Sequence, residues 1–349
     1  MSALPARPPI SAPVQEGGGS VAVGVRGLWL VVPIAVLLAV GAGGPEESVL
    51  ILGPLVTYAL PLVVMVAFWW EDWPGTRLGP NWSGWADTAL IAAGGVVLAV
   101  AGQWVAGGID LRGLFDPSPG PGHVPSFPAT LPLAGAVFIV MLQLTLVGEG
   151  WPLRRFGAAV GGPLALLVAW AIGLGLYFAL VEVSPPPGSG VTARSGPVAG
   201  ADFGAAVACI GAWQVLCFVV WRGWPSAGIS SRALRLSCAH TVVLGCGLLS
   251  FLAARLVLEA GTLTGVAGCV VAAGIVCGML LEVPLGRAAG ALVTLVLAAT
   301  LFGALSVLAQ SFSFTRAEPE DWVVHASLNA LAASAILHVA VGRRWPLNR

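Results

Sequence analysis

Apolar residues in this chain of 349 residues gather into ten long runs, which shorter polar segments separate. A segment that crosses the hydrocarbon core of a bilayer needs about 20 predominantly apolar residues. It must also be helical, because lipid offers no partner to an unpaired backbone N–H or C=O group. The pattern therefore predicts ten transmembrane helices, at residues 28–44, 49–70, 86–106, 131–147, 157–181, 203–221, 236–258, 263–281, 288–309 and 322–341.

The arginines fall almost entirely in alternate connecting segments, so the two faces of the predicted bundle differ in charge. One face receives twelve of them: Arg7, Arg26, Arg77, Arg154, Arg155, Arg222, Arg232, Arg235, Arg287, Arg343, Arg344 and Arg349. The other face receives Arg112, Arg194 and Arg316. Because short cytoplasmic loops retain positive charge during insertion, the arginine-rich face is predicted to be cytoplasmic. With an even number of spans, both chain ends are then cytoplasmic.

The composition agrees with a membrane protein, since 57% of residues are hydrophobic and only 9% are charged, too few to cover a water-soluble domain. Residues 1–26 are rich in Pro, Gly and Ser and are predicted to be a disordered cytoplasmic tail. Residues 27–349 are predicted to be a single transmembrane helical domain. The expected fold is an all-α polytopic bundle, and its ten spans would also suit a 5+5 inverted repeat like that of secondary transporters.

A two-residue motif recurs after each helix that is predicted to run from outside to inside. Its five occurrences are Trp73-Pro74, Trp151-Pro152, Trp224-Pro225, Val283-Pro284 and Trp345-Pro346. Tryptophan is favoured at headgroup depth, and proline is tolerated in the first turn of a following helix. We interpret these pairs as interfacial anchors and helix starters. The alternative is that the Trp-Pro loops form a docking surface for a cytoplasmic protein partner.

Polar residues inside the apolar spans are candidate binding residues, because lipid exposure would cost them a few kcal/mol. Pro54 and Pro61 flank Thr57 and Tyr58 in the second span, and helix breaks of this kind free backbone groups that can line a cavity. His325 and Asn329 lie four residues apart and so share one face of the tenth span. The predicted solute-binding residues are Tyr58, Gln143, His325 and Asn329.

The six cysteines offer an alternative site, because the sixth, seventh and eighth predicted spans each hold two of them, eight residues apart. One member of each pair lies about one turn from the cytoplasmic end, at the depth of two histidines. The residues of this layer are Cys217, Cys238, His240, Cys277 and His338. Thiolates and imidazoles at one depth could hold copper or zinc, or two histidines could ligate a haem. The competing interpretation is that these cysteines only pack between helices.

Three further residues have simple interpretations. Arg255 and Glu259 lie four residues apart near the outer end of the seventh span, which favours an ion pair between them. His123 lies in a polar loop rich in Pro and Gly and is expected to be solvated.

The sequence excludes several function classes. It contains no lysine, so neither a Schiff base nor a phosphate-loop lysine is available, and it shows no catalytic motif. It has no basic face for nucleic acid. The function predicted from the remaining features is a permease or channel for a small solute or ion. Its predicted location is the cell membrane (inner or plasma membrane) of a bacterium. The alternative is a metal-binding, haem-binding or accessory subunit of a membrane complex.

Overall fold

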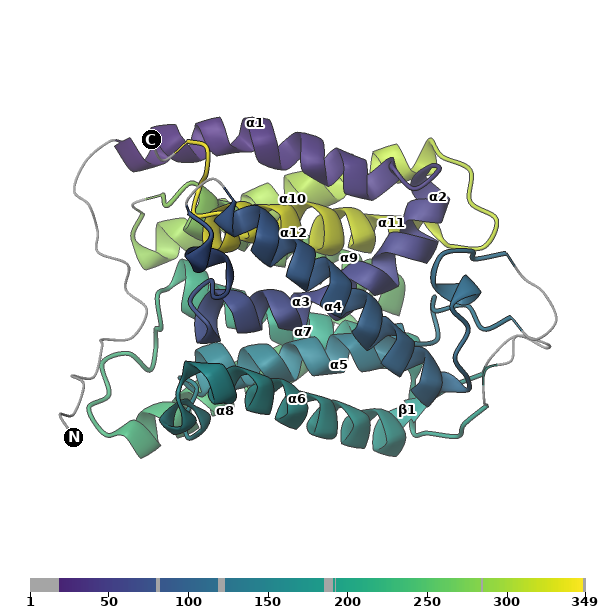
Figure 1. The fold of residues 1–349 in the computed structure, drawn as a ribbon, viewed down its shortest axis with the longest axis horizontal. Coiled ribbons are helices and arrows are strands. Elements are labelled where there is room, and N and C mark those ends of the chain that lie inside the picture. The colour runs from purple at the N-terminus through teal and green to yellow at the C-terminus, as the bar shows by residue number, and fades with distance from the viewer. Residues whose placement is uncertain are drawn as a thin grey trace.

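A computed structural model describes residues 19–79, 82–118, 123–184, 191, 193–283 and 285–347. The chain is mostly helical, and its long helices lie side by side along one axis (Figure 1). Within the described residues, nine helices are long and apolar enough to span a membrane, and the shorter helix Leu131–Val147 is also apolar. Together they account for all ten predicted spans, so the prediction of a multi-span helical membrane protein is confirmed.

Five helices are inner helices, each ending in a five-residue π-helical turn. Their segments are α3 (Gly53–Val64) with η2 (Met65–Trp69), α5 (Leu131–Leu142) with η5 (Gln143–Val147), α7 (Gly200–Val215) with η7 (Leu216–Val220), α9 (Ala260–Ile275) with η8 (Val276–Leu280), and α11 (Pro319–Val324), η9 (His325–Ala332), α12 (Ala333–Ile336) and η10 (Leu337–Val341). Two short segments, α2 (Pro45–Glu47) and η1 (Ser48–Leu52), precede α3.

The other five long helices are outer helices. They are α1 (Gly19–Val40), α4 (Ser83–Ala106), α6 (Ala158–Leu180), α8 (Arg232–Ala254) and α10 (Arg287–Gln310). The connections contain the short turns η3 (Gly75–Arg77), η4 (Arg112–Leu114) and η6 (Leu153–Phe156), and the parallel strand pair β1 (Val181–Glu182) and β2 (Val198–Ala199).

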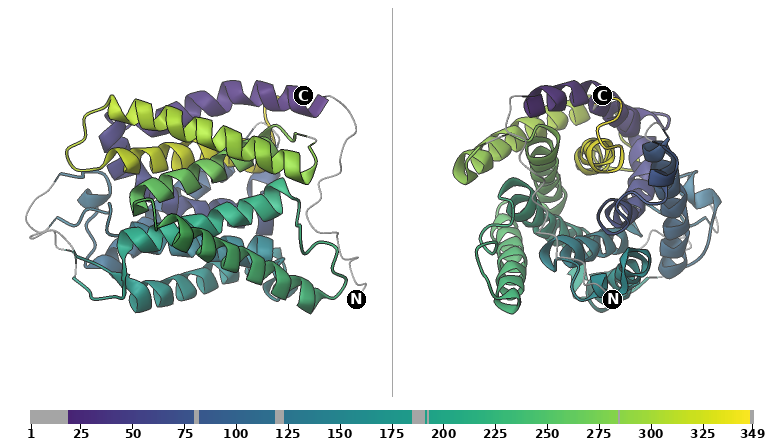
Figure 2. Two further views of the ribbon diagram at one scale, coloured as in Figure 1. Left: turned by 180° about the vertical axis from the view of Figure 1, so that it is seen from behind. Right: turned by 60° about the vertical axis from the view of Figure 1, so that its left-hand side comes forward.

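Burial separates the two sets of helices. In the most apolar window of the four long inner helices 56% to 72% of the residues are buried, whereas in the outer helices 11% to 33% are. An outer helix that leaves so much apolar surface uncovered requires lipid around it. Figure 2, in its right-hand view, shows α8 and α10 at the periphery and the yellow α12 inside the purple α1.

The inner helices form a closed ring, and each carries one outer helix on its back. The order around the ring is α3, α5, α7, α9 and then the α11–α12 segment, which returns to α3. α4 packs on α3, α6 on α5, α8 on α7 and α10 on α9, while α1 packs on η9 and closes the series. Four of these pairs are hairpins of consecutive helices, and the fifth joins the first helix of the chain to the last, so the unit that occurs five times is an inner helix with an outer helix on its back. This pattern does not confirm the predicted 5+5 inverted repeat.

The start of the first helix corrects the predicted tail. α1 begins at Gly19, so residues 19–26 are helical and do not belong to a disordered segment, and residues 1–18 lie outside the described part of the chain. The apolar run had indicated a start at residue 28 because Gly19–Gly27 is poor in large apolar residues. Tertiary contact holds this turn: a Cβ on Gly24 would collide with the Leu280 backbone of η8.

All five inner helices end with the same backbone cap. In each, the residue after the last turn donates its N–H to a carbonyl six positions back: Asp72 to Val66 (2.9 Å), Gly150 to Leu144 (2.8 Å), Gly223 to Cys217 (2.8 Å), Val283 to Cys277 (3.1 Å) and Arg344 to His338 (2.8 Å). The corresponding bond of a Schellman cap spans five positions. Here the π-helical last turn adds one residue, and the residue before the donor likewise lies in the left-handed region. We call the loops that follow these caps the cap loops, and the end of the bundle where they lie the Trp-Pro end.

Interactions between neighbouring units join the five cap loops into a ring. Arg154 donates to the Phe68 carbonyl (3.1 Å), linking the second unit to the first. Glu149 binds Arg235 of α8 through two hydrogen bonds, at 2.6 Å and 3.0 Å. The remaining contacts are Trp221 Nε1 with the Arg287 carbonyl (3.2 Å), Arg344 with Glu282, and Arg343 with Asp72 (2.6 Å).

The opposite end of the bundle is held by carboxylates that accept backbone hydrogen bonds. Glu46 accepts from the N–H groups of Thr315 (2.6 Å), Arg316 (2.5 Å) and Ala317 (3.1 Å), which fastens the loop before α11 to α2. In the loop after α4, Asp110 accepts from the Val124 N–H at 3.1 Å.

Two expectations at this end are wrong. Arg255 does not pair with Glu259; its Nε lies 2.6 Å from Asp202 at the start of α7, because α8 ends at Ala254 and leaves Arg255 beside the neighbouring helix. His123 is not solvated. It is 5% exposed, its Nδ1 lies 2.6 Å from Asp110, and its Nε2 lies 2.6 Å from the Asp116 carbonyl.

The link between Glu149 and Arg235 gives a test of the cap-loop ring. The hydrogen bonds from Arg235 hold the pKa of Glu149 below its ordinary value of 4.5. We expect Glu149→Gln to lower the free energy of unfolding by about 1–3 kcal/mol at neutral pH, because Arg235 loses its charged partner. A carboxylate with a lowered pKa stabilises the fold above its ordinary pKa, and this contribution is lost as the pH falls through the lowered value.

The measurement is thermal unfolding in detergent at neutral pH and at a pH well below 4.5. The difference between wild type and Glu149→Gln should shrink at the acidic pH. Glu259→Gln is the matched control, since Glu259 is exposed and makes no ion pair within the described residues. A difference that is the same at both pH values would contradict the assigned role of this ion pair.

Candidate functional site

The inner ring encloses a cavity of about 2510 Å³, which residues from all five inner helices line. It reaches from the cap loops at the Trp-Pro end, where Glu71 and Arg222 line it, to the opposite end, where Glu182 and Asp321 line it. Typical pockets for small molecules measure about 300–1,000 Å³. The cavity is therefore large enough for a bulky ligand, and it lies along the axis on which a solute would cross the bilayer.

The middle of the cavity is lined by apolar side chains. Each inner helix contributes at least one: Val64 from α3, Phe138 from α5, Val215 from α7, Ile275 from α9 and Ile336 from α12. A bare ion that entered this stretch would lose its hydration without gaining polar partners, which is strongly unfavourable. Apolar groups, in contrast, gain free energy on leaving water for such a surface.

One polar cluster interrupts this apolar lining, formed by Thr57, His325 and Asn329. The Asn329 side-chain amide donates to the Gly53 carbonyl (3.1 Å), and Thr57 Oγ1 lies 3.3 Å from Asn329 Oδ1. Gly53 begins α3, directly after the π-helical segment η1, and His325 and Asn329 lie in the π-helical segment η9. π-helical segments are frequent at functional sites.

The hydrogen bonds of His325 define its tautomer. Its Nε2 lies 3.0 Å from the Leu38 carbonyl, which can only accept, so Nε2 carries the proton. Nδ1 is then an acceptor, and its nearest donor is Asn329 Nδ2 at 3.5 Å. His325 thus offers a weakly used acceptor beside the cavity.

Two of the four predicted solute-binding residues do not line the cavity. Tyr58 points between helices, where its hydroxyl donates to the Thr130 carbonyl (3.2 Å) and its ring stacks on Trp170. Gln143 lies behind the inner ring, 2.8 Å from His240 Nδ1, and accepts from Gln214 at 2.7 Å. We therefore assign both to helix packing, and Thr57 takes the place that Tyr58 was expected to fill.

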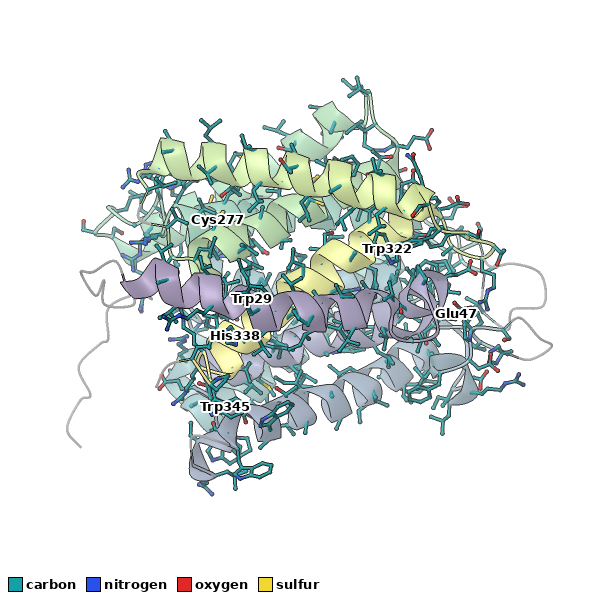
Figure 3. The ribbon with its side chains drawn as sticks, turned by 90° about the horizontal axis from the view of Figure 1, so that it is seen from above. Trp29, Glu47, Cys277, Trp322, His338 and Trp345 are labelled. Atoms are coloured by element: carbon teal, nitrogen blue, oxygen red, sulfur yellow. The ribbon has the colours of Figure 1, made fainter. Side chains whose placement is uncertain are left out.

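The structure does not bring the predicted layer of cysteines and histidines together as a ligand set. His240 on α8 faces Gln143, whereas the ring of His338 on η10 packs against Gly27 of α1. Figure 3 shows His338 and Cys277 on different helices. Cys217 is buried with apolar neighbours, and Cys238 is partly buried on α8. No group of three or more His, Cys, Asp or Glu side chains in the described part of the chain could hold a metal ion.

The two ends of the cavity carry charges of different sign. At the Trp-Pro end the lining includes four arginines and three glutamates: Arg154, Arg222, Arg232, Arg235, Glu71, Glu149 and Glu282. At the opposite end the charged lining residues among those described are Glu182 and Asp321. The cavity therefore runs from a mouth rich in arginine to an acidic mouth.

Sequence reasoning missed the charged residues in the left-handed position of the five caps. These are Glu71 (φ 52°), Glu149 (φ 53°), Arg222 (φ 51°), Glu282 (φ 46°) and Arg343 (φ 49°). Glycine is the usual residue at this position, because a Cβ there costs about 1–2 kcal/mol. A signal existed in the sequence, since a charged residue stands three positions before the proline in each of the four Trp-Pro motifs.

No family model, no curated protein and no solved structure matches this chain. The central cavity is the feature from which a function can be inferred.

The left-handed position of Arg222 yields a stability test. Arg222→Gly should be more stable than Arg222→Ala by about 1 kcal/mol, because glycine adopts φ 51° without the Cβ penalty. The order should reverse at Arg155, which lies in the turn Leu153–Phe156 outside the left-handed region. Thermal unfolding followed by tryptophan fluorescence gives both comparisons. The same order at both positions would contradict a specific strain at Arg222.

Proposed function

We propose that this protein is a multi-pass permease of the cell membrane, and that its solute crosses the bilayer through the central cavity. The observation that carries the proposal is the cavity of about 2510 Å³ inside the ring of inner helices, with charged groups at both of its ends. Ligand sites between helices of a membrane bundle are the usual place for transported solutes.

The apolar middle of the cavity favours an amphiphilic or apolar solute over an inorganic ion. Val64, Phe138 and Ile336 offer no polar ligand to replace the hydration shell of an ion. A channel for ions would instead present rings of carbonyl or charged groups along its pore. This narrows the sequence-based prediction, which had left ions and small solutes open.

The cluster of Thr57, His325 and Asn329 supplies the polar contacts that orient the solute. Its free acceptor capacity lies at His325 Nδ1, whose one donor within the described residues, Asn329 Nδ2, is 3.5 Å away. A solute with a hydroxyl or amide group can donate to this nitrogen while its apolar part lies against the neighbouring helices. Directional contacts of this kind confer specificity within an apolar pocket.

The transport proposal is tested by filling the cavity. Gly135 on α5 lines it, and a Cβ added there would meet no atom within 4 Å. Gly135→Trp should reduce the transport rate at least about tenfold, because the indole occupies the path of the solute. The assay uses proteoliposomes and three fluorescent amphiphiles: the anionic anilinonaphthalene sulfonate, cationic ethidium and a neutral dansyl amide.

Gly175→Trp is the matched control. Gly175 lies on the outer helix α6, and its Cβ position is equally open, but it does not line the cavity. At least one amphiphile should cross faster with wild type and with Gly175→Trp than with Gly135→Trp. If no amphiphile crosses faster than in protein-free liposomes, or if Gly135→Trp transports like wild type, the proposal is wrong.

We further propose that the Trp-Pro end is cytoplasmic, as the arginine distribution predicts. Reporter fusions at the C-terminus test this orientation: a fused alkaline phosphatase should be inactive, and a fused green fluorescent protein should fluoresce. Fusions after Ala106, at the opposite end of α4, should give the reverse result. Active phosphatase at the C-terminus would contradict the orientation without affecting the cavity.

A further inference from the structure

We infer that the cavity binds an anionic amphiphile of the phospholipid type, with its headgroup at Arg222 in the Trp-Pro mouth and its hydrocarbon chains between the inner helices. This inference rests on the proposed function when it names the transported solute, but binding can be tested without transport. Three observations carry it: the unpaired arginine, the polarity of the two mouths, and the apolar middle.

Arg222 is the charged cap residue whose charge is not balanced. Its counterpart Glu149 pairs with Arg235, and Glu282 pairs with Arg344. Arg222 is exposed, lines the cavity, and makes neither an ion pair nor a hydrogen bond within the part of the chain that the structure describes. A guanidinium in this position is available to a phosphate, which it can bind through two parallel hydrogen bonds.

Two other arginines of the same mouth also retain donors for an anion. Arg232 lies 3.9 Å from Glu149, beyond hydrogen-bond distance, and its side chain is 60% exposed. Arg154 gives one N–H to the Phe68 carbonyl and has no carboxylate partner among the described residues. Ser230, which also lines the cavity, adds a hydroxyl. A phosphate group at this mouth can therefore be approached by several donors.

The opposite mouth disfavours an anion, because the charged residues that line it in the described part of the chain are the carboxylates Glu182 and Asp321. A phosphate placed there would meet like charge, whereas at the Trp-Pro end it meets an excess of arginine. The difference between the mouths fixes the direction of a bound amphiphile, with its charged group at the arginine-rich end.

The apolar middle requires that the anion carry hydrocarbon. Each CH₂ group that enters such a surface contributes about 0.8 kcal/mol, so an acyl chain gains much more than the headgroup contacts alone. The four long inner helices contain 21 to 25 residues, and 21 residues of helix extend about 30 Å. The cavity between them is therefore long enough to hold acyl chains over the depth of a bilayer. A free phosphate could not use this lining.

The test is binding of lipids of identical acyl chains to the purified full-length protein, measured by native mass spectrometry from detergent. Dioleoyl phosphatidylglycerol should bind at least about tenfold more tightly than dioleoyl phosphatidylcholine, whose headgroup carries no net charge. Arg222→Gln should remove most of this preference. Arg155→Gln is the matched control, because Arg155 is an exposed arginine of the same end that does not line the cavity, and it should keep the preference.

Two further experiments test whether lipid binding depends on the acyl chains in the cavity or on the phosphate group alone. Gly135→Trp should weaken the binding of both lipids, because the indole takes the place of the chains, whereas Gly175→Trp should not. Inorganic phosphate should fail to displace the bound phosphatidylglycerol. Equal affinity for the two lipids, a preference that survives in Arg222→Gln, or full displacement by phosphate would each overturn the inference.

These outcomes are distinguishable from those of the transport assay. Selective binding of phosphatidylglycerol without movement of any amphiphile would retain the lipid site and reject the permease. Movement that Gly135→Trp blocks, without any preference for the anionic lipid, would retain the permease and reject the lipid site.

Discussion

The capping of five parallel helix ends at one level is the constraint on which this structure depends. The inner helices all run toward the Trp-Pro end, so the negative ends of their dipoles and their unpaired carbonyls gather there. Arginines pair these carbonyls and place positive charge at the negative ends of the dipoles. Arg154 donates to the Phe68 carbonyl (3.1 Å) and Arg344 to the Met279 carbonyl (2.9 Å). Some of the arginines from which a cytoplasmic face is predicted therefore also have a structural role in the ring.

The same constraint explains why strained residues persist at the caps. Glycine at the left-handed position of each cap would avoid the cost of a positive φ, yet the chain keeps charged residues there, among them Glu149, Glu282 and Arg343. Each of these three side chains forms an ion pair with a residue of a neighbouring unit, as Glu149 does with Arg235. The ion pairs offset the backbone strain. Arg222 has the same strain without such a pair among the described residues, and this asymmetry is what suggests a ligand.

Much of the fold could be predicted from the sequence, because the hydrocarbon core of the bilayer imposes length and apolarity on every span. The helix 131–147 matches its predicted range, and the other spans differ by a few residues at their ends, except that the first helix begins at Gly19 and not at residue 28. The ring could not be predicted, because the hydropathy pattern shows which segments cross the membrane and does not show which helices are in contact. The four Trp-Pro motifs and the Val-Pro motif marked the ends of the five inner helices, but they did not reveal that α1 packs on the last inner helix.

Two of the four predicted solute-binding residues line the cavity and two do not, and the difference has one physical cause. His325 and Asn329 share a helix face that lines the cavity, whereas Tyr58 and Gln143 turn toward neighbouring helices. All four are polar residues in apolar spans, and each satisfies the rule that such a group must find a partner. That partner can be a helix or a solute, and the rule does not say which. The orientation of a side chain around its helix follows from the ring, so a polar residue becomes a binding residue only when the helix that carries it turns that face inward.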